Sequence, residues 1–417
     1  MSDWTSECLN QLVAFQKGRK VETSPFQTQG FEPYLGAGAL SGRYDGYAST
    51  FLAVTANKQD VLMLWDGERS GLVGYNLSGV VSSTVCKLTP NEKIDNELLY
   101  YLLLFNFDWI QNRRTGTGVP HVPKDIGRIL KLDYPTDIYL QQKVTRILQT
   151  IDQVIEKTEA LIEKYQHIKA GLMRDLFTRG IDADGKLRPP REQAPELYQQ
   201  TPIGWIPKEW EVALFGEYIE VIDPNPSHRY PLEVDDGYPI CSTENFQGED
   251  GFNFENVKRV PQATYQAQNK RCRFKTTDVI FARKGKIGLA RRYGEDIKVF
   301  SHTVVVMKPS SELVGSDWLL WLTRSDWLLK AIEVTMNTNS GVPTRGVEFI
   351  KNITVPFPKN EEQKIMHTFL ESASNKIQAE REERNKLIKQ KSGLMQDLLT
   401  GKVPVTVNNN IAEVAHG

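Results

Sequence analysis

The chain has 417 residues, of which 40% are hydrophobic and 25% are charged, so it is long enough for several domains with hydrophobic cores. Its formal net charge of -1 excludes a polycation that binds nucleic acid along its whole length, so any nucleic-acid surface has to be local. The longest apolar run, Leu98–Phe105, is too short to span a membrane. Four cysteines lie without paired spacing, which fits a reducing cytoplasm and argues against a structural zinc site. We therefore expect a soluble, cytoplasmic protein.

The first predicted domain covers residues 1–135 and has mixed α/β character. Short apolar runs such as Phe51–Val54 and Val61–Leu64 predict strands, and the glycines between such runs predict turns. Leu98–Trp109 is an apolar and aromatic run that is long enough for a buried helix. A polar loop follows it at Asn112–Gly118.

A long helix is predicted over residues 136–180. Its apolar residues recur at alternating steps of three and four, which is the pattern of a coiled-coil seam. Thr136 or Asp137 can cap its start, and Gly180 supplies a left-handed stop. Such a helix is about 60 Å long, so we expect it to pack against another helix. The expected seam consists of Val144, Ile147, Ile151, Val154, Thr158, Leu161, Tyr165, Ile168 and Leu172.

A linker and a second domain follow. The proline-rich residues 181–203 predict an extended, exposed linker, and the second domain is predicted over residues 204–359. Trp318, Trp321 and Trp327 lie among leucines at helical spacing, which favours a core helix over a ligand site.

The chain is predicted to end with a second long helix and a tail. The helix covers residues 360–401, and residues 402–417 are expected to be flexible. The three-four steps continue here, but Glu380 and Arg384 fall on them near the centre. The helix pair is therefore not expected to be a uniform apolar zipper.

Sequence blocks from the first half recur in the second half at an almost constant offset, between 218 and 223 residues. Near-constant spacing over five blocks indicates duplication. We therefore predict an α+β fold with two tandem α/β domains, separated by two long antiparallel helices that form a coiled coil with pseudo-twofold symmetry. The matched blocks are Asp60–Leu62 with Asp278–Ile280, Ser82–Val85 with Ser301–Val304, Thr117–Pro120 with Ser340–Pro343, Gln142–Lys143 with Gln363–Lys364, and Gly171–Thr178 with Gly393–Thr400.

Motifs for catalysis are not found in the sequence. The nearest string to an adenine methyltransferase signature is Asp223–Pro226, which lacks the second adjacent proline and the stacking aromatic residue. Arg283–Gly288 resembles a phosphate-binding loop only superficially, because Ile280 and Ile287 stand where the first glycine and the Ser/Thr ligand would be. The histidines show no i, i+4 pair for a metal. We therefore expect no catalysis and no metal site.

One stretch of the second domain is strongly basic. Lys258–Lys298 contains twelve basic residues and three acidic ones, a net charge of +9. Such a patch could release counterions from DNA phosphates, and arginine can also read guanine in the major groove. The alternative is a solvated sheet face. The two Gly-Val-Pro loops offer a second surface, in which glycine and proline would fix the loop and the flanking polar residues would contact bases.

These features together resemble the specificity subunit of type I restriction-modification systems. The resemblance covers essentially the whole chain and is most specific at Gly204–Trp210, typical of the opening of a target recognition domain, and at the two helix ends Gly171–Thr178 and Gly393–Thr400. It implies that each domain reads one half of a split, double-stranded DNA site and that the helices fix the gap between the halves. It also implies that the helices dock modification (methyltransferase) subunits, of which we expect two. These carry S-adenosylmethionine, while restriction subunits join through them and use ATP and Mg²⁺, so this chain would bind no cofactor itself.

The resemblance leads us to predict DNA contacts in both halves. Two other interpretations remain open: the recognition subunit of a related methyltransferase system without a translocase, and a coiled-coil adaptor whose variable blocks bind proteins. The predicted DNA contacts are Trp65, Arg69, Ser82, Arg114, Thr117 and His121 in the first half, and Arg283, Lys284, Lys286, Ser301, His302, Asn339, Ser340 and Arg345 in the second half.

Overall fold

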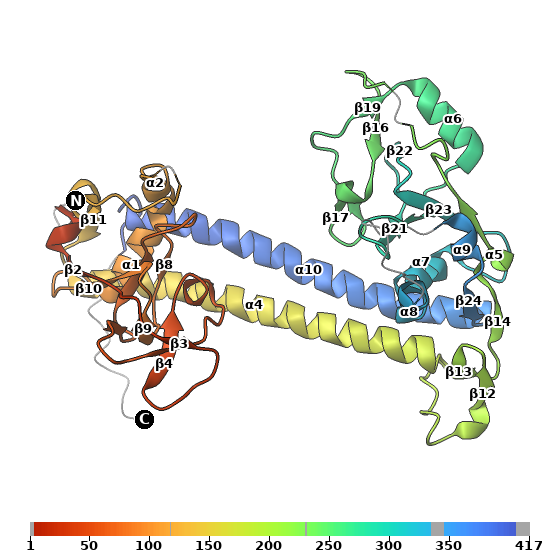
Figure 1. Cartoon of the computed structure of the whole chain (residues 1–417), viewed down its shortest axis with the longest axis horizontal. Helices are drawn as coiled ribbons and strands as arrows, with labels where there is room; N and C mark the ends of the chain where they lie inside the picture. Colours follow the sequence, from red (N-terminus) through yellow and green to blue (C-terminus); the bar gives the residue numbers. More distant parts are fainter. Residues whose placement is uncertain (1–3, 117, 230–231, 335–345, 406–417) are drawn as a thin grey trace. The chain divides into compact units, whose positions relative to one another are not determined.

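The computed structural model describes residues 4–116, 118–229, 232–334 and 346–405 and divides into two compact units (Figure 1). Unit 1 comprises residues 1–160 and 380–417, and unit 2 comprises residues 161–379. The two long helices are α4 (Ile138–Thr178) and α10 (Asn360–Leu399). Each of them has one segment in unit 1 and another segment in unit 2. Both helices are present where the periodicity predicts them. Among the described residues, no helix combines the length and the apolar character needed to cross a membrane.

Unit 1 is built from short strands and short helices around its segments of α4 and α10. The strands are β1 (Trp4–Cys8), β2 (Val13–Lys17), β3 (Thr23–Ser24), β4 (Phe31–Leu35), β5 (Tyr47–Ser49), β6 (Thr55–Ala56), β7 (Val61–Leu64), β8 (Val73–Gly74), β9 (Gly79–Val81), β10 (Val85–Pro90) and β11 (Lys131–Pro135). The short helices are α1 (Asn96–Phe105), α2 (Phe107–Gln111) and α3 (Ile126–Ile129).

Unit 2 has the same kinds of element. Its strands are β12 (Tyr198–Thr201), β13 (Gly204–Pro207), β14 (Glu211–Leu214), β15 (Ile219–Ile222), β16 (Tyr238–Cys241), β17 (Phe246–Gln247), β18 (Gly251–Phe252), β19 (Arg259–Val260), β20 (Val279–Ala282), β21 (Ala290–Arg292), β22 (Val299–Phe300), β23 (Val304–Pro309) and β24 (Thr354–Phe357). Its short helices are α5 (Phe215–Tyr218), α6 (Gln262–Cys272), α7 (Ser316–Arg324), α8 (Asp326–Val334) and α9 (Val347–Lys351).

The two units repeat one sheet topology. The four-stranded antiparallel sheet has the order β2-β10-β7-β8 in unit 1 and β15-β23-β20-β21 in unit 2. The edge pairing agrees, because Val13 lies opposite Pro90 and Ile219 lies opposite Pro309. A separate two-stranded ribbon precedes each long helix, β1-β11 before α4 and β14-β24 before α10. The structure therefore confirms the duplication and the expected fold class.

Each unit has a core in which sheet, short helices and long-helix segments share apolar side chains. In unit 1, Val144 and Leu148 of α4 share a core with Met395 and Leu398 of α10. In unit 2, Leu176 and Phe177 of α4 share a core with Met366 and Leu370 of α10, among others. Within each unit the two segments therefore run antiparallel, because the start of one helix packs against the end of the other.

The predicted seam of α4 is only half correct. Val154 and Ile168 are 41% and 49% exposed, whereas Leu148, Ile162 and Leu176 are buried. The buried positions of α4 follow Val144 at steps of four and then three, whereas the prediction used three and then four. Every second position of the predicted seam is therefore shifted by one residue. The sequence could not distinguish the two registers, because apolar residues occupy both sets of positions. On α10, five apolar residues on the predicted three-four steps are buried. They are Met366, Leu370, Ile377, Leu387 and Leu398.

The structure also corrects the repeat alignment. Gln141, not Gln142, is equivalent to Gln363, because these two are buried and bond the same kinds of backbone group, whereas Gln142 is exposed. At the other end of each domain, Gly401 packs against the Trp4 ring as Gly180 packs against the Trp210 ring. Trp4 is therefore the counterpart of Trp210, although the Gly-Trp-Ile-Pro opening is absent from the first half.

Most residues of the predicted linker are exposed, as expected, but a few are buried and anchor it. Arg188, Ala194 and Tyr198 are buried, and the Tyr198–Thr201 and Gly204–Pro207 strands form a hairpin. The reason is a polar anchor: Arg188 Nη1 pairs with the buried Glu362 Oε1 at 2.6 Å. Glu362 also accepts from Trp210 Nε1 at 3.0 Å, so the start of α10 holds the linker and the opening of the second domain together.

The tryptophan helix is a core element, as predicted, but it is broken into α7 and α8. Trp318 and Trp321 are each 1% exposed. Trp327 packs against the same core and donates to Phe177 O at 2.6 Å. Ser325 separates the helices with an extended backbone.

Candidate nucleic-acid interface

Two loops that are distant in sequence meet beside β7 in unit 1. Gly67 N donates to Pro120 O at 2.8 Å, and Val122 N donates to Trp65 O at 2.9 Å. The loop after β7 is therefore joined to the Gly-Val-Pro loop. The sequence repeat singled out the Gly-Val-Pro loop, and Trp65 and Arg69 were candidates in the loop after β7, but the sequence did not predict that the two loops touch.

Asp66 lies at this junction, next to the candidate Trp65 in sequence and in contact with the candidate His121. Its carboxylate lies 2.7 Å from His121 Nδ1 and 2.7 Å from Lys17 Nζ, which comes from the end of β2. The adjacent Trp65 packs edge-on against Phe15 with ring centroids 6.1 Å apart. Trp65 and His121 are thus brought together on one side of the domain.

The two arginine candidates of unit 1 both involve the loop after β7, because Arg114 donates to this loop and Arg69 belongs to it. Arg114 donates to the Glu68 carbonyl oxygen and, through Nε, to Gln111 O at 2.8 Å. Arg69 Nη1 donates to Ser41 Oγ at 3.0 Å and its residue is exposed. A guanidinium carries five N–H donors, so these bonds leave donors that can reach a phosphate or a base.

Ser82 and Ser301 occupy equivalent buried positions before β10 and β23. They are 4% and 1% exposed. Ser82 Oγ lies 3.0 Å from Thr84 Oγ1, and Ser301 Oγ lies 2.7 Å from Thr303 Oγ1. Because each hydroxyl also accepts the N–H two residues later at 3.3 Å, this geometry favours a role in bracing the turn over direct contact with DNA.

Arg283 is the most enclosed of the basic candidates. Its side chain is 7% exposed, and Nη2 pairs with Asp223 Oδ2 at 2.5 Å while Nε donates to His302 O at 3.0 Å. A buried guanidinium paired with a carboxylate is locally neutralised. Arg283 therefore fixes the loop after β20, and the more exposed Lys284 and Lys286 of that loop are better placed to meet a phosphate.

A small aromatic and basic cluster surrounds His302. Its ring stacks on the ring of His228 with centroids 4.7 Å apart, and Lys284 Nζ lies 3.5 Å from its Nε2. Burial lowers the pKa of His302, and the nearby charges of Lys284 and His228 lower it further. His302 is therefore neutral at pH 7 and can offer a hydrogen bond without adding charge.

Sequence reasoning missed that, in each unit, an ion pair of opposite polarity joins the end of the first strand of the sheet to the loop after β7 or β20. In unit 1, Lys17 on β2 pairs with Asp66 after β7. In unit 2, Asp223 after β15 pairs with Arg283 after β20. The loops are equivalent, because two successive N–H groups donate to Thr84 O in unit 1 and to Thr303 O in unit 2. The signal in the sequence was a reversal of charge at matched positions of the repeat.

The basic stretch 258–298 forms a weaker patch than its linear charge predicts. Four of its basic residues pair with acids from outside the stretch, and two more are buried. The count along the sequence omitted these acids, which the fold brings in from other elements. The pairs are Lys258–Glu233, Arg273–Glu220, Arg283–Asp223 and Arg292–Asp317, and the buried residues are Arg291 and Lys298. Lys270, Arg271, Lys275 and Lys286 are exposed.

Four predicted contacts lie outside the described residues. They are Thr117, Asn339, Ser340 and Arg345.

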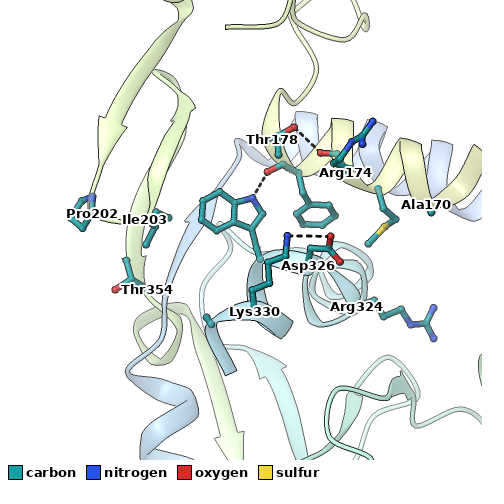
Figure 2. A pocket seen from close by; sticks show the side chains of 13 residues that line it. Ala170, Arg174, Thr178, Pro202, Ile203, Arg324, Asp326, Lys330 and Thr354 are labelled. Atoms are coloured by element: carbon teal, nitrogen blue, oxygen red, sulfur yellow. Dashed lines mark hydrogen bonds and ion pairs between the residues drawn. The ribbon is translucent and has the colours of Figure 1, made fainter. Parts of the chain in front are cut away.

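Unit 2 also contains a pocket of about 830 Å³ between the end of α4, the linker and α8 (Figure 2). Met173, Phe177 and Trp327 line it with apolar surface, and Asp326 and Lys330 form an ion pair of 3.7 Å at its rim. Across the described part of the chain, no group of three or more His, Cys, Asp or Glu residues is arranged to hold a metal ion.

The sequence matches the family model for the type I restriction modification DNA specificity domain over residues 1–165 and 207–390. The chain belongs to this family. A type I restriction enzyme specificity subunit of Methanocaldococcus jannaschii, MjaVIII, is 28% identical over 418 aligned residues, which cover 97% of this chain and 93% of that relative.

Two solved structures of type I systems share the fold of this specificity-domain family member. The crystal structure of the S subunit from M. genitalium has a TM-score of 0.59 at 16% identity and covers 97% of both chains. A chain solved in work on complex assembly and conformational transition of a type I system has a TM-score of 0.52 at 15% identity, with 96% of this chain and 98% of that chain covered.

Proposed function

We propose that the chain is the DNA-specificity subunit of a type I restriction-modification enzyme, in which each half reads one half of a bipartite double-stranded DNA site. The observation that carries this proposal is one scaffold bearing two different loop surfaces. The sheets have the same strand order, yet the equivalent loops carry Trp65 and Asp66 in one unit and Arg283 and Lys284 in the other. Two readers of different sequence on a duplicated frame are what a split site requires.

The DNA contacts would come from the loops after β7 and β20 and from their neighbours. In unit 1 these are Trp65, Arg69, Arg114 and His121, which are partly or largely exposed around the joined loops. In unit 2 they are Lys284, Lys286 and His302. The lysines would neutralise phosphates, and the planar or hydrogen-bonding groups would contact base edges.

The long helices would set the spacer and dock two modification subunits, one for each half of the duplicated chain. Exposed apolar side chains on these helices support docking, since solvent-facing apolar groups on a helix favour a protein partner. They are Val154 and Ile168 on α4, and Phe369 and Ile388 on α10. In this proposal the chain acts in the cytoplasm, is not catalytic and binds no cofactor. S-adenosylmethionine belongs to the modification subunits, and ATP with Mg²⁺ belongs to the restriction subunits.

Methylation mapping tests the proposal directly. The chain and its modification subunit are co-expressed in a host that lacks adenine methylation, and the methylated sites are read from the host genome. We expect a bipartite motif with a fixed spacer only when both proteins are present. A contiguous motif, or methylation that does not depend on this chain, would contradict the proposal.

A double variant sharpens the test. Replacing Lys284 and His302 by Ala should reduce methylation and relax the base preference at one half-site only, because both residues belong to unit 2 and His302 would contact a base edge. The matched variant in unit 1 is Arg69→Ala with Arg114→Ala, which should affect the other half-site. Equal effects of both pairs on the same half-site would contradict separate readers.

A further inference from the structure

Each unit contains a lysine that bridges a long helix and the first core helix after the sheet. In unit 1, Lys391 of α10 pairs with Asp152 of α4 at 2.6 Å and lies 5.6 Å from the ring centroid of Tyr101 in α1. In unit 2, the equivalent lysine is Lys169 of α4, whose ammonium lies 4.9 Å from the ring centroid of Trp321 in α7. The two lysines stand two residues before the repeated Gly-Leu-Met.

The carboxylate that pairs with this lysine has different origins in the two units. In unit 1 it is Asp152, which belongs to the partner helix segment. The equivalent helix position in unit 2 is Ser374, which lies as far after Gln363 as Asp152 lies after Gln141. The acid in unit 2 is instead Glu249, in the turn between β17 and β18 of the recognition domain. Ser374 Oγ donates to Glu249 Oε1 at 3.5 Å, so this turn contacts both long helices.

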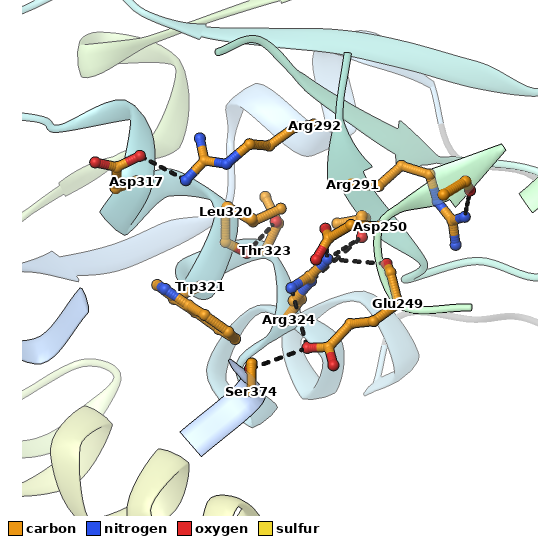
Figure 3. A network of polar contacts seen from close by, with 12 residues as sticks. Glu249, Asp250, Arg291, Arg292, Asp317, Leu320, Trp321, Thr323, Arg324 and Ser374 are labelled. Atoms are coloured by element: carbon orange, nitrogen blue, oxygen red, sulfur yellow. Dashed lines mark hydrogen bonds and ion pairs between the residues drawn. The ribbon is translucent and has the colours of Figure 1, made fainter. Parts of the chain in front are cut away.

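Arg324 at the end of α7 completes the attachment (Figure 3). Its guanidinium reaches Glu249 Oε1 at 3.2 Å, Glu249 O at 3.1 Å and Asp250 Oδ1 at 2.5 Å, and its Nε donates to Ala290 O at 3.2 Å. The side chains of Lys169 and Arg324 are only 15% and 13% exposed. Charge-assisted bonds in such a sheltered place are stronger and less screened by salt than those of an exposed pair.

Arg291 also holds the hairpin formed by β17 and β18. Arg291 lies over the ring of Phe246 at 3.8 Å and donates to Gln247 O at 3.2 Å and to Gly251 O. Burial lowers the pKa of Arg291 to about 10, so it remains protonated at neutral pH. The turn that carries Glu249 is therefore braced and can transmit its attachment to the domain.

We propose that Glu249 is a positioning residue that locks the second recognition domain onto the helix pair and thereby enforces the spacer length. This inference rests on the proposed function. A recognition domain that rocks on its helices can reach half-sites displaced by one base pair, about 3.4 Å along the DNA axis. An attachment to both helices through one carboxylate opposes that rocking. Unit 1 has no equivalent bond among its described residues, because there the acid belongs to the helix.

The test compares spacer discrimination in the complex of this chain with its modification subunit. Methylation mapping is repeated with Glu249→Ala, and the ratio of sites with a spacer one base pair too short or too long to correctly spaced sites is measured. We expect this ratio to rise about tenfold, equivalent to about 1.4 kcal/mol, while both half-site sequences stay the same. A folded Glu249→Ala variant with the wild-type spacer ratio would overturn the proposal.

A second variant separates positioning from stability. Glu249→Ala combined with Ser374→Asp gives Lys169 a helix-borne acid, as Asp152 gives Lys391 in unit 1. We expect it to recover thermal stability and to keep the relaxed spacer ratio. Recovery of spacer discrimination as well would show that the lost ion pair mattered only for stability, which would overturn the proposal.

The matched control is Glu220→Gln. Glu220 pairs with Arg273 of the same domain at 2.7 Å, and both side chains are exposed, so the spacer ratio should not change. A change as large as that of Glu249→Ala would contradict a specific role for the attachment. If the wild-type complex methylates no bipartite site at all, it is the proposed function that fails, and this outcome is distinct from every result above.

Discussion

Gln141 and Gln363 make the same three hydrogen bonds in the two units. In each case the amide oxygen accepts a hydrogen bond from one backbone N–H just before a core helix. The amide nitrogen donates to two carbonyl oxygens. One of these belongs to the last residue of the preceding ribbon strand in unit 1, and to the residue after that strand in unit 2. The partners are Asp95, Lys93 and Pro135 for Gln141, and Gly315, Leu313 and Pro358 for Gln363. The first turn of each long helix is thus fixed to its own domain by one side chain.

Replacing either glutamine by alanine should destabilise only the unit that contains it. Gln363→Ala removes the partner of one N–H and two carbonyl oxygens, and each of these groups that stays buried and unsatisfied costs about 1–3 kcal/mol of unfolding free energy. Hydrogen exchange measured by mass spectrometry should show faster exchange in unit 2 for Gln363→Ala and in unit 1 for Gln141→Ala. The exposed Gln142→Ala is the control, and an equal effect from it would contradict the assignment of Gln141 as the anchor.

Arg283 and Lys286 should respond differently to substitution, although both were predicted to contact DNA. Lys286→Ala is expected to weaken DNA binding by the assembled complex and to reduce the slope of log affinity against log salt by about one, as the loss of one phosphate contact does. Arg283→Ala should lower thermal stability, because it removes the guanidinium that pairs with the partly buried Asp223. Binding is measured on a duplex carrying the mapped site over a range of salt concentrations. An unchanged salt slope for Lys286→Ala would remove it from the interface.

The exposed apolar residues of α4 should matter for assembly and not for folding. Val154→Glu and Ile168→Glu place a charge on side chains that already face solvent, so the melting temperature should stay within about 2 °C of wild type. Co-purification with the modification subunit should be strongly reduced, because a desolvated carboxylate is costly in an apolar interface. Gln153→Glu, at an exposed neighbouring position, is the control. Undiminished co-purification of the two variants would exclude this stripe from the docking surface.

The sequence was sufficient for the two long helices, the duplication and the core tryptophans, because each depends on a local period or a local match. It was insufficient where packing had to choose between equal local patterns. Ile147 and Leu148 are neighbours, and either could lie on the seam by spacing alone. The structure buries Leu148 completely and leaves Ile147 partly exposed.

The candidate interface was predictable in its loops but not in the state of its charges. The family resemblance led to candidates in the segments after β7 and β20, and the structure joins the first of these segments to the Gly-Val-Pro loop. Pairing depends on acids distant in sequence, as with Arg283 and Asp223, so a linear charge count could not show which cations remain available. The contact between Trp4 and Gly401 could not be predicted either, because these residues are distant in sequence and only the fold brings them together.

His302 should make the stability of unit 2 depend on pH. Its pKa is lowered in the folded protein, first by burial and then by Lys284, His228 and Arg283, while Asp223 opposes the shift. The unfolded chain, with a histidine pKa of about 6.5, therefore binds a proton before the folded chain does. The resulting stability is present above about pH 6.5 and is lost as the pH falls through the lower pKa of the folded state. Urea unfolding at several pH values should show this decline for the wild-type chain.

His302→Gln should flatten that decline, because glutamine fills a similar space and does not titrate. His167→Gln, at an exposed position of α4 outside the cluster, is the control for the loss of a histidine as such. The comparison is made on the difference in unfolding free energy between pH 7.5 and pH 5.5, with the same buffer ions and salt, so that screening is constant. If His302→Gln loses as much stability over this range as the wild-type chain does, the cluster of Lys284, His228 and His302 does not control the acid sensitivity of the domain.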